Sequence, residues 1–301
     1  MKSKAFAKIN LSLDVTGVND NGYHTLESVF LPVEFYDVVE IKKSKKMKYS
    51  CNKWYVLFNK KNTVIKAVTY MKEKYHIEDN FNISLSKLIP TQAGLGGGSA
   101  DAAAVIRILN KMYSLKMSAE EIKEACMSIG SDVLFTYYNK PAYVKSLGED
   151  LTFIDIKNNY YVLLVKPSFG ISTKKSYDKL DMEKCDHPNI KELVDALKEG
   201  EDINHMLGNS LEQPSIALRA EINKIKKQMI DKGGENALMS GSGSCIFSIS
   251  TNKNKIDKLA ASMKKIGYFV RTTRVINEWK RFQIIDYLSI IKSAEETPRR
   301  K

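Results

Sequence analysis

Cysteine is scarce in this chain of 301 residues, and its few thiols stand far apart. Cys51, Cys126, Cys185 and Cys245 form no C-x-x-C pair, so we expect neither a structural zinc site nor a disulfide framework. Apolar runs near the roughly 18 residues that a membrane span needs are also missing. The segment 1–4 leads directly into a strand-like pattern and lacks the apolar core of a signal peptide, so we expect a cytoplasmic protein without a membrane partner.

Arginine is the second scarce residue type, although the chain is strongly basic. The net charge is +12, but only seven of the 47 basic residues are arginines. Arginine suits bidentate recognition of bases and phosphates better than lysine does, so we interpret most lysines as solvated surface. A basic nucleic-acid-binding module remains a less favoured alternative, and we expect no nucleic-acid partner.

The first half of the sequence predicts an antiparallel sheet and several helices. Residues 5–15 alternate between apolar and polar side chains, which is typical of a strand with one apolar and one polar face. Further strands are predicted over residues 26–33, 37–43 and 81–87. Helices are predicted over residues 62–75, 99–113 and 118–128, and Ser118 with Glu121 has the spacing of a capping box at the start of the last one.

The second half restarts with a strand over residues 161–165 and continues with strands over 245–250 and 267–274. Helical patterns cover residues 173–180, 190–199, 216–232 and 253–265. The polar stretch 155–159 marks a boundary, so the predicted domains span 1–157 and 158–285, with a flexible tail over 286–301. Because strands and helices alternate without a regular βαβ series, the sequence predicts an α+β fold.

The most informative stretch is a glycine-rich loop before a helix that we expect to begin at Ser99. Gly94, Gly96, Gly97 and Gly98 lack the Cβ atoms that would keep a ligand away from the backbone, and a helix N-terminus favours a phosphate. The loop is not a Walker A loop, because no Lys-Ser/Thr follows, and Ser99 replaces the last glycine of a Rossmann fingerprint. Taken alone, the loop could equally be a turn without a ligand.

Three segments in order resemble the motifs of the GHMP kinases over about residues 5–275. The loop resembles the second motif, P-x-x-x-G-L-G-G-G-S-[SA], which wraps the ATP phosphates in that family. Residues 7–11, Ala-Lys-Ile-Asn-Leu, resemble the first motif. Residues 240–247, Ser-Gly-Ser-Gly-Ser-Cys-Ile-Phe, resemble the third. Phe6 and Leu134 stand where the family usually has proline, and Ala100 replaces a frequent serine.

Four further segments are similar to the subfamily that phosphorylates 4-diphosphocytidyl-2-C-methylerythritol. They are Gly-Tyr-His at residues 22–24, Asn-Thr-Val-Ile-Lys-Ala at 62–67, Gly-Ser-Asp-Val at 130–133 and Asn-Ser-Leu-Glu at 209–212. This resemblance implies a two-domain GHMP kinase fold, with an N-terminal domain like domain 2 of ribosomal protein S5 and a ferredoxin-like C-terminal α/β sandwich. It also implies ATP and Mg²⁺, a cytidine diphosphate alcohol as substrate, and a monomer or homodimer.

The resemblance also implies the site residues. Asp132 would take the proton of the accepting hydroxyl, although an aspartate after Gly130 could simply cap the next helix. Lys8 would pair with Asp132. The implied ATP contacts are Pro90, Thr91, Gln92, Ala93, Gly94, Leu95, Gly96, Gly97, Gly98, Ser99, Ala100, Asn62, Lys66 and Lys87. The implied substrate contacts, besides Asp132, are Asn10, Tyr23, His24, Tyr177, Gly241, Ser242 and Gly243.

Ser99 could also help to place Mg²⁺, but we expect the metal to keep mostly water and phosphate ligands and no all-protein metal site. Another GHMP kinase, such as a homoserine or mevalonate kinase, stays open as an alternative. The cytosine pocket around Tyr23, His24 and Tyr177 would distinguish between them, because planar rings can stack on a pyrimidine and an imidazole can bond its edge.

Overall fold

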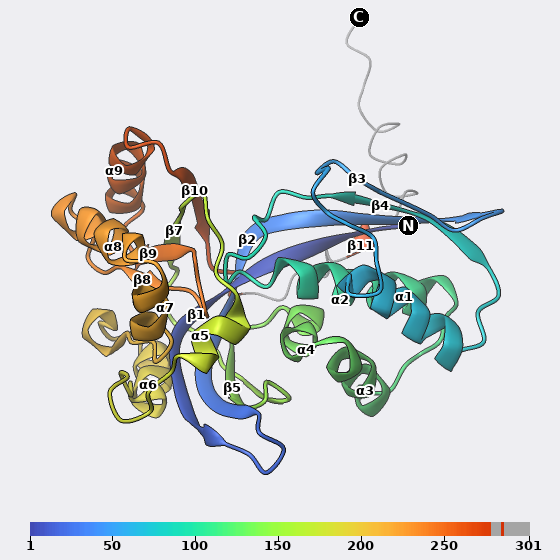
Figure 1. Cartoon of the computed structure of the whole chain (residues 1–301), viewed down its shortest axis with the longest axis horizontal. Helices are drawn as coiled ribbons and strands as arrows, with labels where there is room; N and C mark the ends of the chain where they lie inside the picture. Colours follow the sequence, from blue (N-terminus) through green and yellow to red (C-terminus); the bar gives the residue numbers. More distant parts are fainter. Residues whose placement is uncertain (278–283, 286–301) are drawn as a thin grey trace, which may run out of the picture.

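The computed structural model describes residues 1–277 and Ile284–Ile285, and these residues form two mainly antiparallel sheets with helices around them (Figure 1). The larger sheet has the strand order β11-β1-β2-β4-β3, with β5 beside β2 and β6 beside β5. The smaller sheet has the order β10-β7-β9-β8. The α+β prediction is confirmed.

The strands of the larger sheet are β1 (Lys2–Val18), β2 (His24–Ser44), β3 (Lys48–Cys51), β4 (Asn80–Ser86), β5 (Ala142–Ser146), β6 (Asp150–Phe153) and β11 (Ile284–Ile285). Those of the smaller sheet are β7 (Tyr161–Lys166), β8 (Leu238–Met239), β9 (Ile246–Ser250) and β10 (Phe269–Arg274). The helices are α1 (Thr63–Lys74), α2 (Gly97–Met112), α3 (Ala119–Ile129), α4 (Ser131–Tyr138), α5 (Thr173–Asp178), α6 (Ile190–Glu199), the short 3₁₀ helix η1 (Asn204–Met206), α7 (Glu212–Leu218), α8 (Glu221–Asp231) and α9 (Lys253–Lys264).

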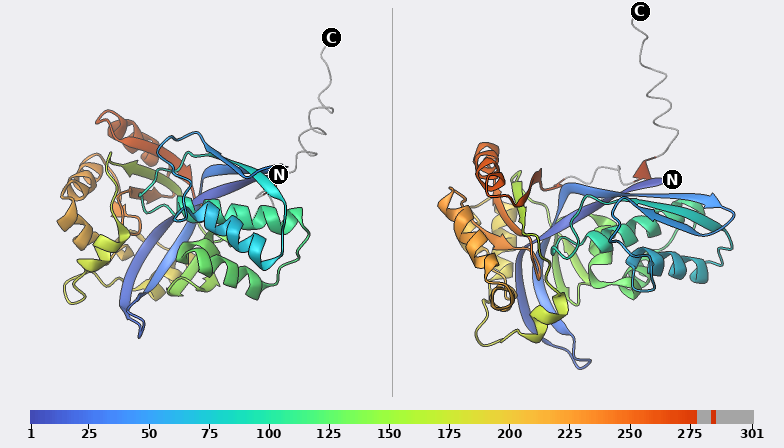
Figure 2. Two further views of the ribbon diagram at one scale, coloured as in Figure 1. Left: turned by 45° about the vertical axis from the view of Figure 1, so that its right-hand side comes forward. Right: turned by 45° about the horizontal axis from the view of Figure 1, so that its top comes forward.

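A long hairpin of β1 and β2 runs through the molecule, from the helices α1–α4 to the helices around the smaller sheet (Figure 2). The separate strands predicted over 26–33 and 37–43 are one continuous strand, β2, because β1 pairs with β2 from His24 to Glu40. The two predicted pieces match the two parts of β2 that pair with different strands along the edge opposite β1. There, β5 pairs with residues 26–30 and β4 pairs with residues 38–44.

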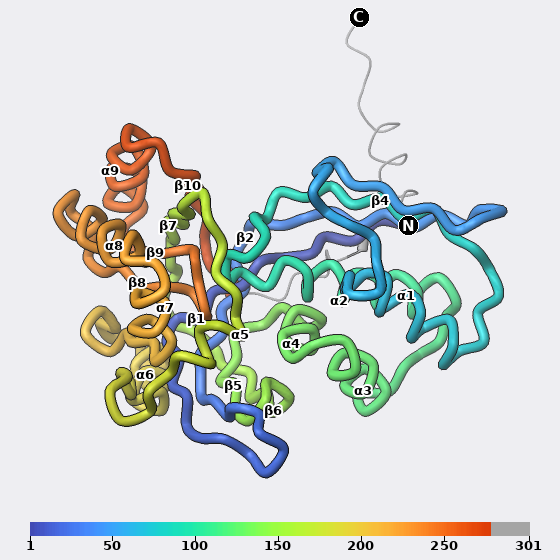
Figure 3. The backbone as a smooth tube through the Cα atoms, in the orientation of Figure 1, coloured from blue at the N-terminus to red at the C-terminus, as the bar shows by residue number. Residues whose placement is uncertain are grey.

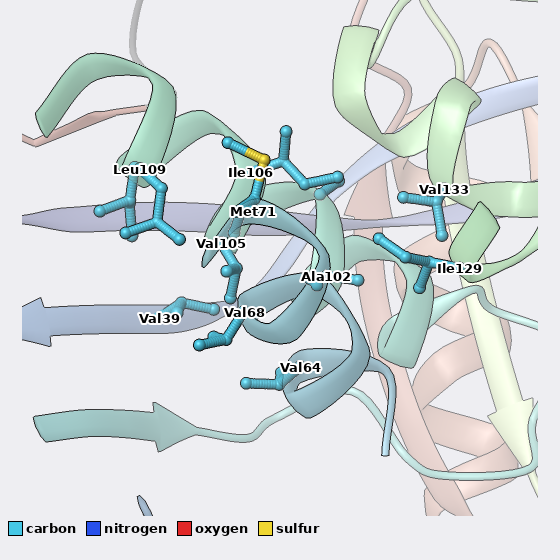
Figure 4. Packing of buried hydrophobic residues seen from close by; sticks show 14 of the residues in the cluster. Val39, Val64, Val68, Met71, Ala102, Val105, Ile106, Leu109, Ile129 and Val133 are labelled. Carbon is cyan, nitrogen blue, oxygen red and sulfur yellow. The ribbon is translucent and has the colours of Figure 1, made fainter. Parts of the chain in front are cut away.

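Helices α1–α4 lie on one side of the larger sheet, as the backbone tube shows (Figure 3). On α1, Val64, Val68 and Met71 follow a spacing that puts them on one helical face, and all three are buried. They meet residues of α2 and Val39 of β2 in the core (Figure 4). Because α2 is rich in alanine, its backbone can lie close to the neighbouring elements, and residues 100–109 are all buried.

A second apolar cluster joins the two sheets. It contains Ile9 and Leu11 of β1 together with Val162 and Leu164 of β7 and Phe247 of β9, all essentially inaccessible to solvent. One face of the hairpin is therefore buried against the smaller sheet. The apolar face predicted for residues 5–15 is thus correct, but Lys8, Asn10 and Ser12 on the polar face are buried as well.

Two sequence predictions need correction. The helix predicted over 216–232 is interrupted: α7 ends at Leu218, Arg219 has an extended backbone, and α8 begins at Glu221. Ile284–Ile285 pairs with β1, so this pair lies in the larger sheet and not in the second domain where the sequence placed it. The predicted tail over 286–301 lies outside the described residues. We retain the division near residue 157 as a proposal.

We predict that Gly94→Ala lowers the free energy of unfolding more than Gly233→Ala does. Both glycines have positive φ angles, +74° and +93°, so either alanine costs about 1–2 kcal/mol of left-handed strain. A Cβ on Gly94 would lie only 1.9 Å from the carbonyl oxygen of Ser240, whereas no described residue beyond the two chain neighbours comes within 4 Å of a Cβ on Gly233. We therefore expect at least about 2 kcal/mol of additional loss for Gly94→Ala, measured by urea denaturation. Equal losses would contradict this close contact.

Candidate active site

The glycine-rich loop forms the N-terminus of α2. Gly96 adopts the left-handed conformation that precedes the helix, with a φ of +66°, and the helix begins at Gly97, two residues earlier than predicted. The first intrahelical bond runs from Ala100 N to Gly96 O at 2.9 Å. The N–H groups of residues 97–99 precede it, so they and the helix dipole favour an anion at this end.

The smaller sheet supports this loop from behind. The backbone N–H groups of Ser244 and Cys245 donate to the carbonyl oxygens of Gln92 and Ala93 at 3.3 and 3.1 Å. The Ser240 hydroxyl donates to Gly94 O at 3.0 Å and accepts from Asn10 N at 3.2 Å. The third motif segment, residues 240–247, therefore holds the loop against β1.

Lys8 and Asp132 lie side by side, as the sequence predicted. Lys8 Nζ is 3.4 Å from Asp132 Oδ2 and donates to Asn10 Oδ1 at 2.6 Å. It also lies 4.4 Å from the centre of the Phe30 ring. The Lys8 side chain is only 5% exposed, whereas that of Asp132 is 30% exposed. A nearly buried ammonium thus faces a carboxylate that a ligand can reach.

Asp132 is not an N-cap residue. The N-cap of α4 is Gly130, and Asp132 lies in the first turn without a side-chain cap bond. The alternative that this carboxylate serves mainly as a cap is therefore wrong. The nearby Tyr177 phenol has its pKa raised to about 12 by burial and by the negative charge of Asp132, so the phenol is neutral.

Lys87 lies beneath the loop between two buried carboxylates. Its Nζ donates to Asp37 Oδ2 at 2.5 Å and to Asp101 Oδ2 at 2.6 Å. The other oxygen of Asp37 accepts the backbone N–H groups of Leu88 and Ile89. Lys87 still borders the predicted nucleotide site, but two of its three N–H donors are already used.

A cavity of about 640 Å³ opens between the loop, β1, α4, α5 and the third segment. The predicted residues that line it are Lys8, Asn10, Lys87, Pro90, Thr91, Gln92, Ala93, Gly94, Leu95, Gly96, Gly97, Gly98, Ser99, Asp132, Gly241, Ser242 and Gly243. Its lining therefore includes residues of all three motif segments, which lie far apart in the sequence.

Three predicted ATP contacts do not line this cavity. Asn62 caps α1 by accepting from Val64 N at 2.9 Å, and its Nδ2 donates to Leu57 O. Lys66 lies one turn further along α1 and borders a separate depression near α3. Ala100 is fully buried in the core. For Asn62 and Ala100 the structure therefore shows a structural role, because their groups are used in the cap and in packing.

The predicted pyrimidine-binding aromatics lie at the tip of the hairpin and on α5. Tyr23 is 65% exposed, and the rings of His24 and Tyr177 stack on each other with centroids 4.8 Å apart and an interplanar angle of 25°. At this distance no third ring fits between His24 and Tyr177. Among the described residues, His24 Nδ1 has no hydrogen-bond partner and is buried, so its hydrogen-bonding capacity is unused in this structure.

Several residues of the site escaped the sequence analysis. Thr63 lines the cavity and donates to Gly98 O at 2.7 Å, and Thr173 bonds the Ser242 hydroxyl at 2.9 Å. Asp37 and Asp101 hold Lys87. Thr63 follows the predicted Asn62 directly, and Asp101 lies at the end of the loop motif, so both carried a weak signal. Asp37 and Thr173 carried none.

Among the residues that the structure describes, no cluster of three His, Cys, Asp or Glu side chains is arranged to bind a metal ion. The described helices also include none with the length and apolarity to cross a membrane.

Comparison with protein families identifies the class. The model of the GHMP kinases N terminal domain matches residues 62–140, and the model of the GHMP kinases C terminal domain matches residues 188–268. These matches cover both halves of the chain and include the loop and Asp132. The chain belongs to the GHMP kinase family.

More specific similarity extends over nearly the whole chain. It is 38% identical over 283 residues to 4-diphosphocytidyl-2-C-methyl-D-erythritol kinase of Thermoanaerobacter pseudethanolicus, covering 92% of this chain and 97% of that protein. A crystal structure of 4-(cytidine 5'-diphospho)-2C-methyl-D-erythritol kinase superposes with a TM-score of 0.78 and 26% identity over 91% of this chain and 99% of the other. Homoserine kinase from Cytophaga hutchinsonii shares the fold, with a TM-score of 0.72 and 22% identity over 91% of this chain and 94% of the other.

We predict that the Asp101 carboxyl makes the protein less stable as the pH rises from 4 to 7. Burial raises the pKa of Asp101 from 3.8 to about 7, although Lys87 opposes this shift. Between these two values the folded state binds more protons than the unfolded state, so the free energy of unfolding falls with rising pH. In Asp101→Asn this component should vanish.

The measurement is thermal denaturation across this pH range, with Asp20→Asn on the exposed hairpin turn as the control. If Asp101→Asn keeps the pH dependence of the unchanged protein, the Asp101 carboxyl is charged across this whole pH range. The raised pKa of Asp101 is then wrong.

Proposed function

We propose that the chain transfers the γ-phosphoryl group of ATP to the 2-hydroxyl of 4-diphosphocytidyl-2-C-methyl-D-erythritol, giving the 2-phosphate and ADP in non-mevalonate isoprenoid biosynthesis. One observation carries the chemistry: the Lys8–Asp132 pair, with Nζ and Oδ2 3.4 Å apart, lies in the same cavity as the N-terminus of α2. The similarity to kinases of this name over most of the chain supports the choice of acceptor.

The transfer requires an acceptor hydroxyl in line with the terminal phosphate. Asp132 is the more exposed member of the pair, so its carboxylate can accept the hydroxyl proton as the oxygen attacks phosphorus. Lys8 is nearly buried and donates to Asn10, so its ammonium stays close to the reacting oxygens and offsets the negative charge that spreads over the phosphoryl group.

The triphosphate would be bound by backbone rather than by many charged side chains. The N–H groups of residues 97–99 lie at the positive end of α2, and the carbonyl of Gly98 is held by Thr63. Mg²⁺ would neutralise phosphate charge here. The half-buried Ser99 hydroxyl in the cavity wall fits such an ion, which takes oxygen ligands and keeps several waters.

The cytosine end would lie beyond Leu26, a cavity residue two positions after His24 on β2. Since His24 and Tyr177 already stack on each other, we propose that the exposed Tyr23 ring supplies a face for the base and that His24 Nδ1 bonds its edge. The unpartnered Nδ1 atom supports this role, because burying a polar group without a partner is otherwise unfavourable.

With this proposed activity, the binding partner of the cavity is a small molecule rather than a nucleic acid. Lys8, Lys87 and Lys174 all line the cavity, where they can face the charged groups of ATP and of a diphosphate ester. We propose a cytoplasmic enzyme that acts as a monomer or homodimer.

The test of the acceptor is a panel assay. Purified protein with Mg·ATP is offered 4-diphosphocytidyl-2-C-methyl-D-erythritol, mevalonate, homoserine or galactose, and ADP is measured. We expect ADP with the first compound, and a kcat lower by about 10²–10⁴-fold in Asp132→Asn because the proton acceptor is lost. Lys224→Met, an exposed lysine of α8 that does not line the cavity, is the control and should retain activity. ADP with another alcohol but not with the first would overturn the assignment.

We further predict that His24→Ala raises the KM for the cytidine substrate about tenfold, the effect of losing roughly 1.4 kcal/mol of binding. The KM for ATP should change little, because His24 lies outside the wall formed by the loop. Steady-state kinetics with each substrate varied in turn makes the comparison, and His205→Ala, on the exposed η1 segment, is the control. A rise in the KM for ATP alone would place His24 elsewhere in the mechanism.

A further inference from the structure

A buried chain of hydrogen bonds connects Lys8 to a serine outside the cavity wall. Lys8 Nζ donates to Asn10 Oδ1 at 2.6 Å, and Asn10 Nδ2 donates to Ser28 Oγ at 3.2 Å. Ser28 Oγ in turn donates to the backbone carbonyl of Ser12 at 2.5 Å. Lys8, Asn10 and Ser28 are 4%, 1% and 0% exposed, so bulk water cannot substitute for any of these partners.

The direction of every proton in this chain is determined by its two ends. An ammonium can only donate and a backbone carbonyl can only accept. The Ser28 hydroxyl must therefore give its proton to Ser12 O and accept from the amide of Asn10. The Asn10 amide must then point its NH₂ group at Ser28 and its oxygen at Lys8. A flipped amide would place NH₂ against NH₃⁺ and lose both bonds.

Asn10 needs this support because its amide has little intrinsic orientation. The terminal torsion of asparagine is broad and roughly two-fold, so hydrogen bonds decide which way the amide faces. The bond from Asn10 N to Ser240 Oγ holds only the backbone. Among the described side chains, Ser28 accepts the hydrogen bond that the Asn10 NH₂ group donates.

We propose that Ser28 is a positioning residue for phosphoryl transfer: by orienting the Asn10 amide, it holds the Lys8 ammonium beside Asp132. The proposal rests on the function proposed above for Lys8. Among the described residues, the other polar or aromatic contacts of the Lys8 ammonium are the looser ones to Asp132 at 3.4 Å and to the Phe30 ring at 4.4 Å. Without the oriented amide, the ammonium can shift within the site, and small displacements of reacting groups cost large factors in rate.

The test is a double-mutant cycle on kcat. Ser28→Ala removes the acceptor of the Asn10 amide, and we expect kcat to fall about tenfold while the KM for ATP stays within twofold. In an Asn10→Ala background, Ser28→Ala should change kcat less than twofold, because the group through which it acts is gone. Ser248→Ala is the matched control: a serine 1% exposed on β9, whose loss should leave kcat unchanged.

The experiment uses the full chain, well below its unfolding temperature, with whichever alcohol the acceptor panel identifies. A failure of the acceptor assignment is therefore distinguishable from a failure of this proposal. If Ser28→Ala does not fold, Ser28→Cys is measured instead, because its thiol keeps a weak acceptor of similar size. Its kcat should fall by less than the roughly tenfold expected for Ser28→Ala. An unchanged kcat in Ser28→Ala, or an equal fall with and without Asn10, would overturn the role of Ser28.

Discussion

The rest of the site depends on one contact, the passage of the glycine-rich loop against the turn at Ser240. The Ser240 hydroxyl bonds Gly94 O and Asn10 N at once, and the backbones are so close that only glycine fits at position 94. Through this contact the smaller sheet holds both the phosphate-binding end of α2 and the strand that carries Lys8. The site belongs to both halves of the fold, although its main chemical groups come from the first.

Two of the buried lysines, Lys8 and Lys87, illustrate how surroundings assign roles to identical side chains. Lys87 is enclosed by Asp37 and Asp101, which use two of its N–H donors and make it part of the support beneath the loop. The Lys8 ammonium contacts the amide oxygen of Asn10, the ring face of Phe30 and the partly exposed carboxylate of Asp132. Its charge therefore remains available to a ligand. Burying an ammonium is unfavourable unless it is paired, and the kind of partner decides whether the charge supports structure or serves the reaction.

Local patterns in the sequence predicted what depends on neighbours in the chain. The alternation in β1, the capping box Ser118–Glu121 at α3 and the glycines before α2 each involve residues a few positions apart, and the structure has all three features. Prediction failed where a distant partner decides. β2 looked like two strands, and its neighbour along the other edge changes from β5 to β4.

The sequence alone determined that the chain has a glycine-rich helix start, a lysine strand and an aspartate after Gly130, in the order that the GHMP kinases share. It could not determine that Asn10 orients toward Lys8, that Ser28 holds that amide, or that His24 stacks on Tyr177. Apart from the Lys8–Asn10 bond within β1, these contacts join residues on different strands or helices. Their geometry exists only after the hairpin has packed against the smaller sheet, because hydrogen bonds and ring contacts depend on positions in space rather than on spacing along the chain.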